Sequence, residues 1–127
     1  MKGFSVELEK RTIENEYFRQ VLFTTERSQL VLMTLQPGEN IGLEVHEDHD
    51  QFIRVEAGQG RAVIGGEEFA LMDGSAVVIP AGSEHDIING PEGVMKLYTL
   101  YTPPEHQDGT VHKTKEEALA AHQRSTE

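Results

Sequence analysis

The chain has 127 residues, a formal net charge of −11 and no cysteine. This length predicts one domain with a single hydrophobic core. Without cysteine the chain forms neither disulfides nor thiolate metal sites. Its acidic balance argues against binding to nucleic acids or to a membrane surface, because both depend on Lys and Arg. With no apolar run of about 18 residues and no leader pattern, we expect a cytoplasmic protein.

The first 18 residues allow two interpretations. Residues 4–8 alternate between apolar and polar side chains, as an edge strand does. Residues 12–18 fit either a loop or a helical turn. An unpaired edge strand is a common place for two identical chains to join, so residues 4–8 are our candidate edge for a homodimer.

Short apolar runs rich in Val, Ile and Leu follow at close spacing. They cover residues 20–24, 29–35, 51–56, 61–64, 76–79 and 94–101. Each run is too short for a helix, and tight-turn pairs such as Gly65-Gly66 and Asp73-Gly74 separate them. This pattern predicts an all-β antiparallel sandwich or barrel.

The C-terminal part differs in character from the strands. Residues 103–112 contain two prolines and an Asp-Gly pair, and Thr114 and Glu117 then have the spacing of a capping box before a helix. We therefore predict one domain over residues 1–127, with a barrel core at about 20–102 and a tail and helix at 103–127. The tail either packs on the barrel surface, covers one barrel mouth, or exchanges with a second subunit.

Four side chains have positions from which they could converge inside a barrel. Residues two apart on a strand face the same side, so Glu44 and His46 share a face. Gln51 heads the inward stripe of the next strand, and His85 follows a Pro-Ala-Gly turn that would place it at the start of another. Imidazole nitrogens with carboxylate or amide oxygens suit a divalent cation.

Each of these residues also has an ordinary structural interpretation. A lone histidine is more often hydrogen-bonded than a ligand, and Glu44 lies near an acidic run that solvent would cover. His49 offers a second imidazole near His46, but residues three apart on an extended strand point to opposite faces. We therefore interpret residues 47–50 as an acidic loop and His49 as a solvated or rim residue.

The spacing of these residues resembles that of the cupin superfamily. The family's first motif, G-x5-H-x-H-x4-E-x6-G, is similar to residues 38–58, with Glu44 at its first His and Gln51 at its Glu. The second motif, G-x5-P-x-G-x2-H-x3-N, matches at every defined position of residues 74–89. The resemblance covers about residues 30–102. It implies an RmlC-like double-stranded β-helix, or jelly roll, with a metal in its lumen.

For this chain the resemblance implies that Glu44, His46, Gln51 and His85 bind one divalent transition metal. One carboxylate and two imidazoles leave the same net charge as the usual three His and one Glu. The harder donor set favours Mn, Fe, Ni, Co or Zn over Cu(I). Because an amide is a weak ligand, one coordination position is expected to be labile, as metal catalysis requires.

Two functions remain open from the sequence. The first is a metalloenzyme of the isomerase, lyase or dioxygenase type acting on a small, oxygen-rich molecule, for which no catalytic residue is assigned. The candidates for proton transfer are His49, Tyr101, His106 and His112. The second is a non-catalytic binding or sensing protein with a structural or recognition metal. A third interpretation is a relic jelly roll that binds no metal. The presence of His46 and His85 at the matching spacing argues against it.

Overall fold

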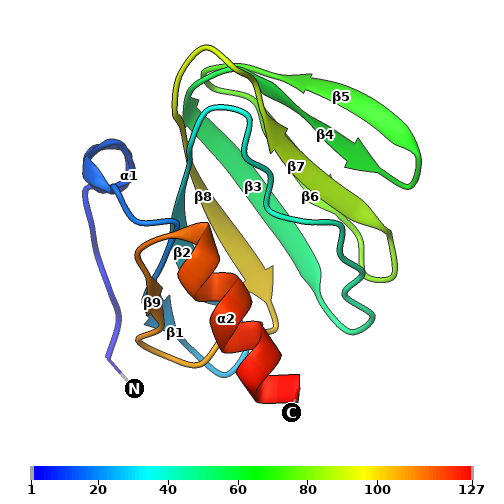
Figure 1. Ribbon diagram of the computed structural model, residues 1–127. Helices are drawn as coiled ribbons and strands as arrows, with labels where there is room; N and C mark the ends of the chain where they lie inside the picture. Colours follow the sequence, from blue (N-terminus) through cyan, green and yellow to red (C-terminus); the bar gives the residue numbers. More distant parts are fainter. Residues whose placement is uncertain (1, 127) are drawn as a thin grey trace.

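The computed structural model describes the backbone of residues 2–126 and side chains as far as Gln123. Its elements are α1 (Leu8–Glu14), β1 (Arg19–Thr24), β2 (Gln29–Leu35), β3 (Asp50–Ala57), β4 (Gly60–Ile64), β5 (Glu67–Leu71), β6 (Ala76–Ile79), β7 (His85–Asn89), β8 (Met95–Thr102), β9 (Val111–His112) and α2 (Lys115–Thr126). One sheet has the order β6-β3-β8-β2-β1-β9 and the other the order β5-β4-β7, all antiparallel. The two sheets face each other (Figure 1). This is the predicted jelly roll with a short C-terminal helix.

The six apolar runs of the sequence all form strands, with ends within one residue of those expected. The glycine turns explain why they end where they do. Gly65 and Gly66 have φ of 57° and 82°, and Gly74 has φ of 86°, a region that L side chains rarely adopt. The first pair joins β4 to β5 as the expected hairpin. Local turn chemistry therefore sets the register of the barrel.

The core lies between the two sheets. Strand β3 alternates as predicted, with Gln51, Ile53 and Val55 buried and the residues between them less so. Leu97 of β8 and Ile87 of β7 are equally buried and belong to the same apolar cluster. Gln51 thus stands at the polar end of an otherwise apolar inward row.

The connection between β2 and β3 carries the first motif across the open side of the barrel (Figure 1). It runs beside β7, where Ile41 N donates to Ile87 O and Glu44 exchanges both backbone hydrogen bonds with His85 at 2.9 Å. The carboxylate of Asp86 accepts hydrogen bonds from Asn40 Nδ2 and Gly42 N, at 2.7 and 2.9 Å. These bonds bring the two motifs side by side.

The edge-strand interpretation of residues 4–8 was wrong, whereas residues 12–14 are helical, as one interpretation of residues 12–18 allowed. Residues 4–7 form no strand, and α1 begins at Leu8. The ring of Phe4 instead stacks on Phe23 of β1, with centroids 4.8 Å apart. The homodimer therefore stays a prediction without the edge strand that was its candidate.

The tail returns to the barrel. Its strand β9 pairs with β1, with Arg19 opposite His112, and α2 follows. Thr114 Oγ1 accepts a hydrogen bond from Glu117 N at 3.1 Å, and the Glu117 carboxylate accepts one from Lys113 N at 2.7 Å. This side-chain pairing confirms the helix start that the capping-box spacing predicted.

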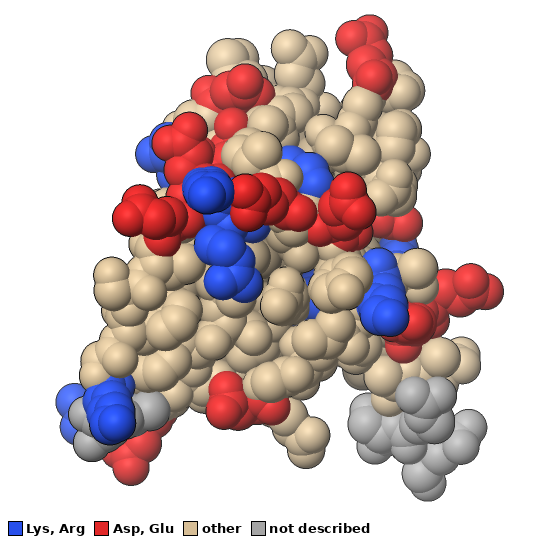
Figure 2. Space-filling view, turned by 90° about the vertical axis from the view of Figure 1, so that its left-hand side faces the viewer, with Lys and Arg blue, Asp and Glu red and all other residues tan. Residues whose placement is uncertain are grey.

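The surface reflects the acidic composition. Figure 2 shows acidic side chains in a band across one face, with Lys and Arg among them, above a broad area with few charges. Among the described residues, no helix has the length and apolar character needed to cross a membrane. The polar side chains that form the candidate site lie at one end of the barrel core.

Candidate metal centre

The structure brings three of the four predicted ligands together. Nε2 of His46 lies 3.3 Å from a carboxylate oxygen of Glu44, and the rings of His46 and His85 are 5.1 Å apart between centroids. As the strand parity predicts, Leu43 and Val45 point outward, with 66% and 43% of their surface exposed. Whether these side chains ligate a metal stays a prediction.

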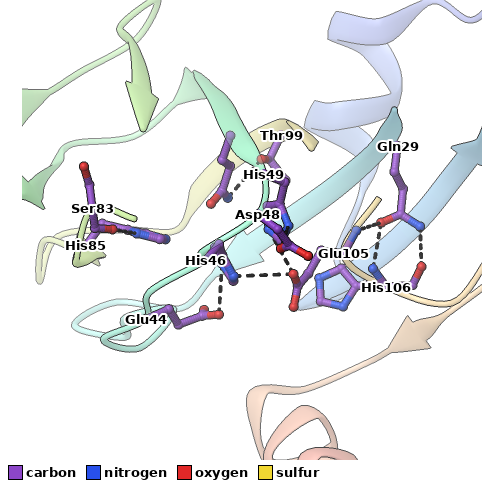
Figure 3. A network of polar contacts seen from close by, with 11 residues as sticks. Gln29, Glu44, His46, Asp48, His49, Ser83, His85, Thr99, Glu105 and His106 are labelled. Carbon is purple, nitrogen blue, oxygen red and sulfur yellow. Dashed lines mark hydrogen bonds and ion pairs between the residues drawn. The ribbon is translucent and has the colours of Figure 1, made fainter. Parts of the chain in front are cut away.

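The imidazole of His85 is fixed by a backbone carbonyl. Its Nδ1 lies 2.9 Å from the carbonyl oxygen of Ser83, which can only accept a hydrogen bond. The proton of a neutral ring is therefore on Nδ1, and Nε2 keeps its lone pair. Gly82 N donates to His46 O at 2.7 Å, so the turn that orients His85 also fixes the backbone of His46. Figure 3 shows these side chains projecting from neighbouring parts of the chain.

Glu44 and His46 perturb each other's protonation. Partial burial works to raise the pKa of Glu44, but the hydrogen bond and charge of His46, together with the charges of Arg19 and His85, outweigh it and the pKa is lowered. The hydrogen bond to Glu44 is the main reason that the pKa of His46 is raised, against the effect of burial. Without a metal, the two therefore favour an imidazolium–carboxylate pair.

Gln51 is buried, with 4% of its surface exposed. Its Nε2 donates to Thr99 Oγ1 at 3.0 Å, which fixes the amide and leaves Oε1 buried without a hydrogen-bond partner among the described residues. Buried acceptors are nearly always satisfied. The unsatisfied oxygen is therefore a candidate ligand atom for a metal ion.

The interpretation of His49 as a solvated residue was wrong, because only 5% of its surface is exposed. Residues 47 and 48 form a bend rather than extended strand, so the opposite-face argument does not apply. The ring of His49 stacks on that of His46, with centroids 4.4 Å apart. Its Nδ1 lies 3.2 Å from a carboxylate oxygen of Asp48, and its Nε2 points to the tail.

Glu105 of the tail is the residue that sequence reasoning missed. One of its oxygens lies 2.9 Å from His49 Nε2 and 3.4 Å from His46 Nδ1. His46, His49 and Glu105 each offer a ligand atom within 4.8 Å of the others, so these three could hold a metal ion. The nearby Pro-Pro pair indicated an unusual segment, but it did not predict where the carboxylate of Glu105 would lie.

The contact between His49 and Glu105 has the geometry of two ligands more than that of a hydrogen bond. Despite the 2.9 Å distance, His49 Nε2 forms no hydrogen bond with any described residue. Neighbouring ligands of an octahedral ion with bonds of about 2.1 Å lie about 3 Å apart. A cation beside both atoms would satisfy them together. The residues present therefore fit a divalent metal.

A buried glutamine holds the tail in place. Gln29, with 1% of its surface exposed, accepts hydrogen bonds from Glu105 N and His106 N at 3.2 and 2.9 Å. Its Nε2 donates to His106 O at 2.6 Å. The two ends of one amide thus bind the backbone of Glu105 and His106 (Figure 3). Of the alternatives for the tail, this arrangement agrees with a tail that packs on the barrel of its own chain.

Tyr101 forms an aromatic wall to the centre. Its ring meets those of His46, His49 and His106 edge-on, at centroid distances of 6.1, 5.6 and 5.4 Å. Burial raises the pKa of Tyr101, so the phenol keeps its proton. Burial lowers the pKa of His106 to about 3, so this imidazole is neutral at ordinary pH. The wall is therefore uncharged.

The comparisons agree with this architecture. A sequence model of the cupin domain matches residues 31–101. The chain belongs to the cupin family. It is 44% identical over 126 residues to YrkC of Bacillus subtilis (strain 168), covering 94% of this chain and 68% of YrkC. Protein L612 of Acanthamoeba polyphaga mimivirus is 41% identical over 112 residues, covering 85% of this chain and 70% of L612.

A solved structure is similar over nearly the whole chain. The crystal structure of BH2720 from Bacillus halodurans has a TM-score of 0.92 and 42% identity to this cupin, covering 94% of this chain and 95% of that one. None of these three names states a substrate or a reaction. The function of this cupin is therefore argued from its own site.

Proposed function

We propose that this cupin is a metal-dependent enzyme that acts on a small, oxygen-rich organic molecule. The observation that carries the proposal is the set of unsatisfied donor atoms at one end of the barrel. Among the described residues, His49 Nε2 and Gln51 Oε1 are buried without hydrogen-bond partners, and the ring of His49 stacks on that of His46, which two carboxylates approach. A fold that only needed a core would be expected to satisfy these groups.

His46 is common to both candidate ligand sets. Glu44, Gln51 and His85 would join it from the barrel, and His49 and Glu105 from the acidic loop and the tail. Nitrogen and carboxylate donors suit Mn, Fe, Ni, Co or Zn. Such an ion supplies Lewis-acid polarisation of a carbonyl or carboxylate oxygen.

The surrounding residues supply the rest of the site. The low exposure of His49, Gln51 and His85 keeps bulk water away from a bound molecule, which strengthens electrostatic interactions there. Glu105, whose side chain is 30% exposed, lies where the centre meets solvent. Its carboxylate is placed to accept a proton from an entering molecule and release it to water.

The proposal is tested with protein purified without an affinity tag. Elemental analysis and calorimetric titration of the metal-free protein with Mn²⁺, Ni²⁺ and Zn²⁺ should show one bound ion per chain. The metal-loaded protein is then incubated with hydroxy acids, oxo acids and sugars, and consumption is followed by NMR. Metal-dependent turnover supports the enzyme. Tight binding of such molecules without turnover would instead favour the binding or sensing protein, and absence of metal binding would refute both.

A further inference from the structure

Residues 103–110 connect β8 to β9, and they cover part of the candidate metal centre. Within this segment, Glu105 places a carboxylate oxygen 2.9 Å from His49 Nε2. That nitrogen is buried, and only 4% of the His49 side chain is exposed. A molecule from solvent therefore cannot reach His49 Nε2 unless part of the chain moves.

The segment is attached to the barrel mainly through one side chain. Gln29 Oε1 accepts hydrogen bonds from Glu105 N and His106 N, and Gln29 Nε2 donates one to His106 O. Apart from the contacts of the Glu105 carboxylate with the centre, no other hydrogen bond or ion pair joins residues 103–109 to the barrel in the described part of the chain. The ring of His106 packs edge-on against Tyr101. Figure 3 shows the Gln29 amide facing the backbone of this segment.

The connection between β2 and β3, on the other side of the centre, is held at several points. Glu44 exchanges both backbone hydrogen bonds with His85, and Gly82 N donates to His46 O. The carboxylate of Asp86 binds the same connection from β7. Moving this connection would break backbone bonds along its length, whereas moving residues 103–110 would break the bonds of one amide. Segments held by few such bonds open most readily.

We propose that residues 103–110 are a lid over the candidate metal centre and that Gln29 is the latch that holds it closed. The inference rests on the proposed function and adds how an ion and a small molecule enter the site. The chain on either side of the lid stays paired, Thr102 with Asp50 and Val111 with Gln20. These pairs confine the motion to the segment between them, as in the lid loops of enzymes.

Opening the lid changes the donor set of the centre as well as its accessibility. In the closed lid, the carboxylate of Glu105 lies beside both His46 and His49. In the open lid it leaves, and Glu44, His46 and His85 remain on the barrel. Closing returns the carboxylate to the histidines, where it excludes water from a bound molecule.

A purely structural role for Gln29 is the competing explanation. Gln29 would then satisfy buried backbone groups of a segment that never opens by itself. The two explanations differ in how the amide protons of the segment exchange with solvent. The amides of a lid exchange through local opening, faster than those of the barrel, whereas the amides of a fixed segment exchange only when the whole fold unfolds.

The first measurement is hydrogen exchange by NMR on the metal-free protein, at the amides of Glu105 and His106 and along the central strand β8. The variants are Gln29→Met, which keeps the size of the side chain without its hydrogen bonds, and Gln29→Glu, which keeps the accepted bonds and loses the donated one. Thr34→Val is the matched control. It removes a buried hydroxyl that donates to Asn15 O, away from the lid.

In the wild type, the two lid amides should be protected, but less than those of β8 and with little dependence on low concentrations of urea. Gln29→Met should speed their exchange about tenfold or more, because each lost hydrogen bond contributes about two- to tenfold. Gln29→Glu should give an intermediate value, and Thr34→Val should leave lid exchange unchanged. Should Gln29→Met fail to fold, Gln29→Glu decides alone.

The second measurement follows Co²⁺ uptake, and Co²⁺ release to excess EDTA, by visible absorbance. Gln29→Met should speed both about tenfold or more, since a more frequently open lid admits and releases the ion alike. Because Kd is the ratio of the two rates, it should change by about threefold or less. A variant that had only damaged the site would instead raise Kd. Thr34→Val should leave both rates unchanged.

Lid amides that exchange only together with those of β8 would overturn the inference, as would unchanged lid exchange in the Gln29 variants. Faster exchange with unchanged Co²⁺ rates would overturn the role of the lid in access. If the wild type binds no Co²⁺, the proposed function fails. The exchange measurements then decide the latch separately, because they use the metal-free protein.

Discussion

The two halves of the candidate metal centre approach His46 through different ring nitrogens. On the barrel side, Glu44 lies 3.3 Å from Nε2, and His85 is held by backbone bonds between the two motifs. On the tail side, Glu105 lies 3.4 Å from Nδ1 and reaches His49 as well. One imidazole cannot direct both nitrogens to one ion. The two halves are therefore two alternative candidate donor sets, with His46 common to both.

The two halves also differ in how firmly they are held. Backbone hydrogen bonds along β7 and the turn before it support Glu44, His46 and His85. The backbone at Glu105 depends instead on the side chain of Gln29, and its carboxylate is partly exposed. Ligands on rigid elements are positioned more accurately than ligands on loops. We therefore expect the barrel side to contribute more to metal affinity.

The largest expected effect is the loss of His46 or His85. His46→Ala removes the imidazole shared by both halves, and His85→Ala removes the one oriented by Ser83. Bound metal should fall to background in each, as measured by elemental analysis after dialysis. His122→Ala, in the C-terminal helix α2, is the control for loss of a histidine. Metal retained in the His46→Ala, His85→Ala double variant would refute the assignment of these ligands.

A smaller but steep effect is expected from pH. Imidazole ligates only when neutral, and the pKa of His46 is raised above about 6.5, mainly by its hydrogen bond to Glu44. Protons should therefore begin to compete with the metal for His46 at a pH above about 6.5, and should compete more strongly as the pH falls. With two histidine ligands, apparent affinity should fall by up to about 100-fold per pH unit where both imidazoles must lose a proton to bind the metal.

The pH dependence of metal-linked stability has the opposite sign to the pH dependence of stability in the metal-free protein. A raised pKa means that protonated His46 stabilises the metal-free fold below about pH 6.5, and this contribution is lost as pH rises through the raised pKa. Metal-linked stabilisation has the opposite pH dependence. Near neutral pH it is about 2.7 kcal/mol when the metal concentration is 100 times Kd, and it is lost on acidification. Thermal melts with and without metal at about pH 7.5 and 5.5 measure the difference. An unchanged metal-induced shift in Tm at the lower pH would place the ion on carboxylates, such as those of residues 47–50.

Gln51→Ala tests the weakest predicted ligand of the barrel side. An amide oxygen is easily replaced by water, so metal affinity should fall about tenfold or less. Gln51→Glu should bind metal more tightly than the wild type, because it adds a negative charge at the orphan position. Calorimetric titration measures both. Unchanged affinity in the two variants would remove Gln51 from the donor set.

The smallest expected effect concerns the tail. Glu105→Gln should lower metal affinity by less than His85→Ala does, by about tenfold, because its carboxylate is partly hydrated. Glu92→Gln, in the exposed connection between β7 and β8, is the matched control. If Glu105→Gln abolishes metal binding while His85→Ala does not, the tail side holds the ion and the ranking proposed here is reversed.

Local patterns predicted most of the barrel. Alternation placed Gln51 inward with Ile53 and Val55, and set Glu44 and His46 on the face opposite Leu43 and Val45. These predictions succeeded because a strand has a period of two wherever its backbone is extended. Glycines with positive φ determined the turns in the same local way. The helix start at Lys115 followed from the Thr114 cap.

Where the backbone was not extended, the same argument failed. A bend at residues 47 and 48 turns His49 into the site, and residues 4–7 leave the strand pattern before α1 begins. Alternation in the sequence does not reveal whether a partner strand is present to pair with it. Without such a partner, the alternation does not show which way each side chain points.

The sequence by itself determined the inward faces of the strands, the turns between them and the meeting of two motifs at His46 and His85. Only the tertiary structure decided that Glu105 joins His49, and that Arg19 is buried without an ion-pair partner in the described part of the chain. The contact that places Glu105 spans 77 residues, from the Gln29 amide to the backbone of His106. Periodicity and turn chemistry act over a few residues, whereas a contact of that span exists only once the barrel has closed and the tail has packed on it.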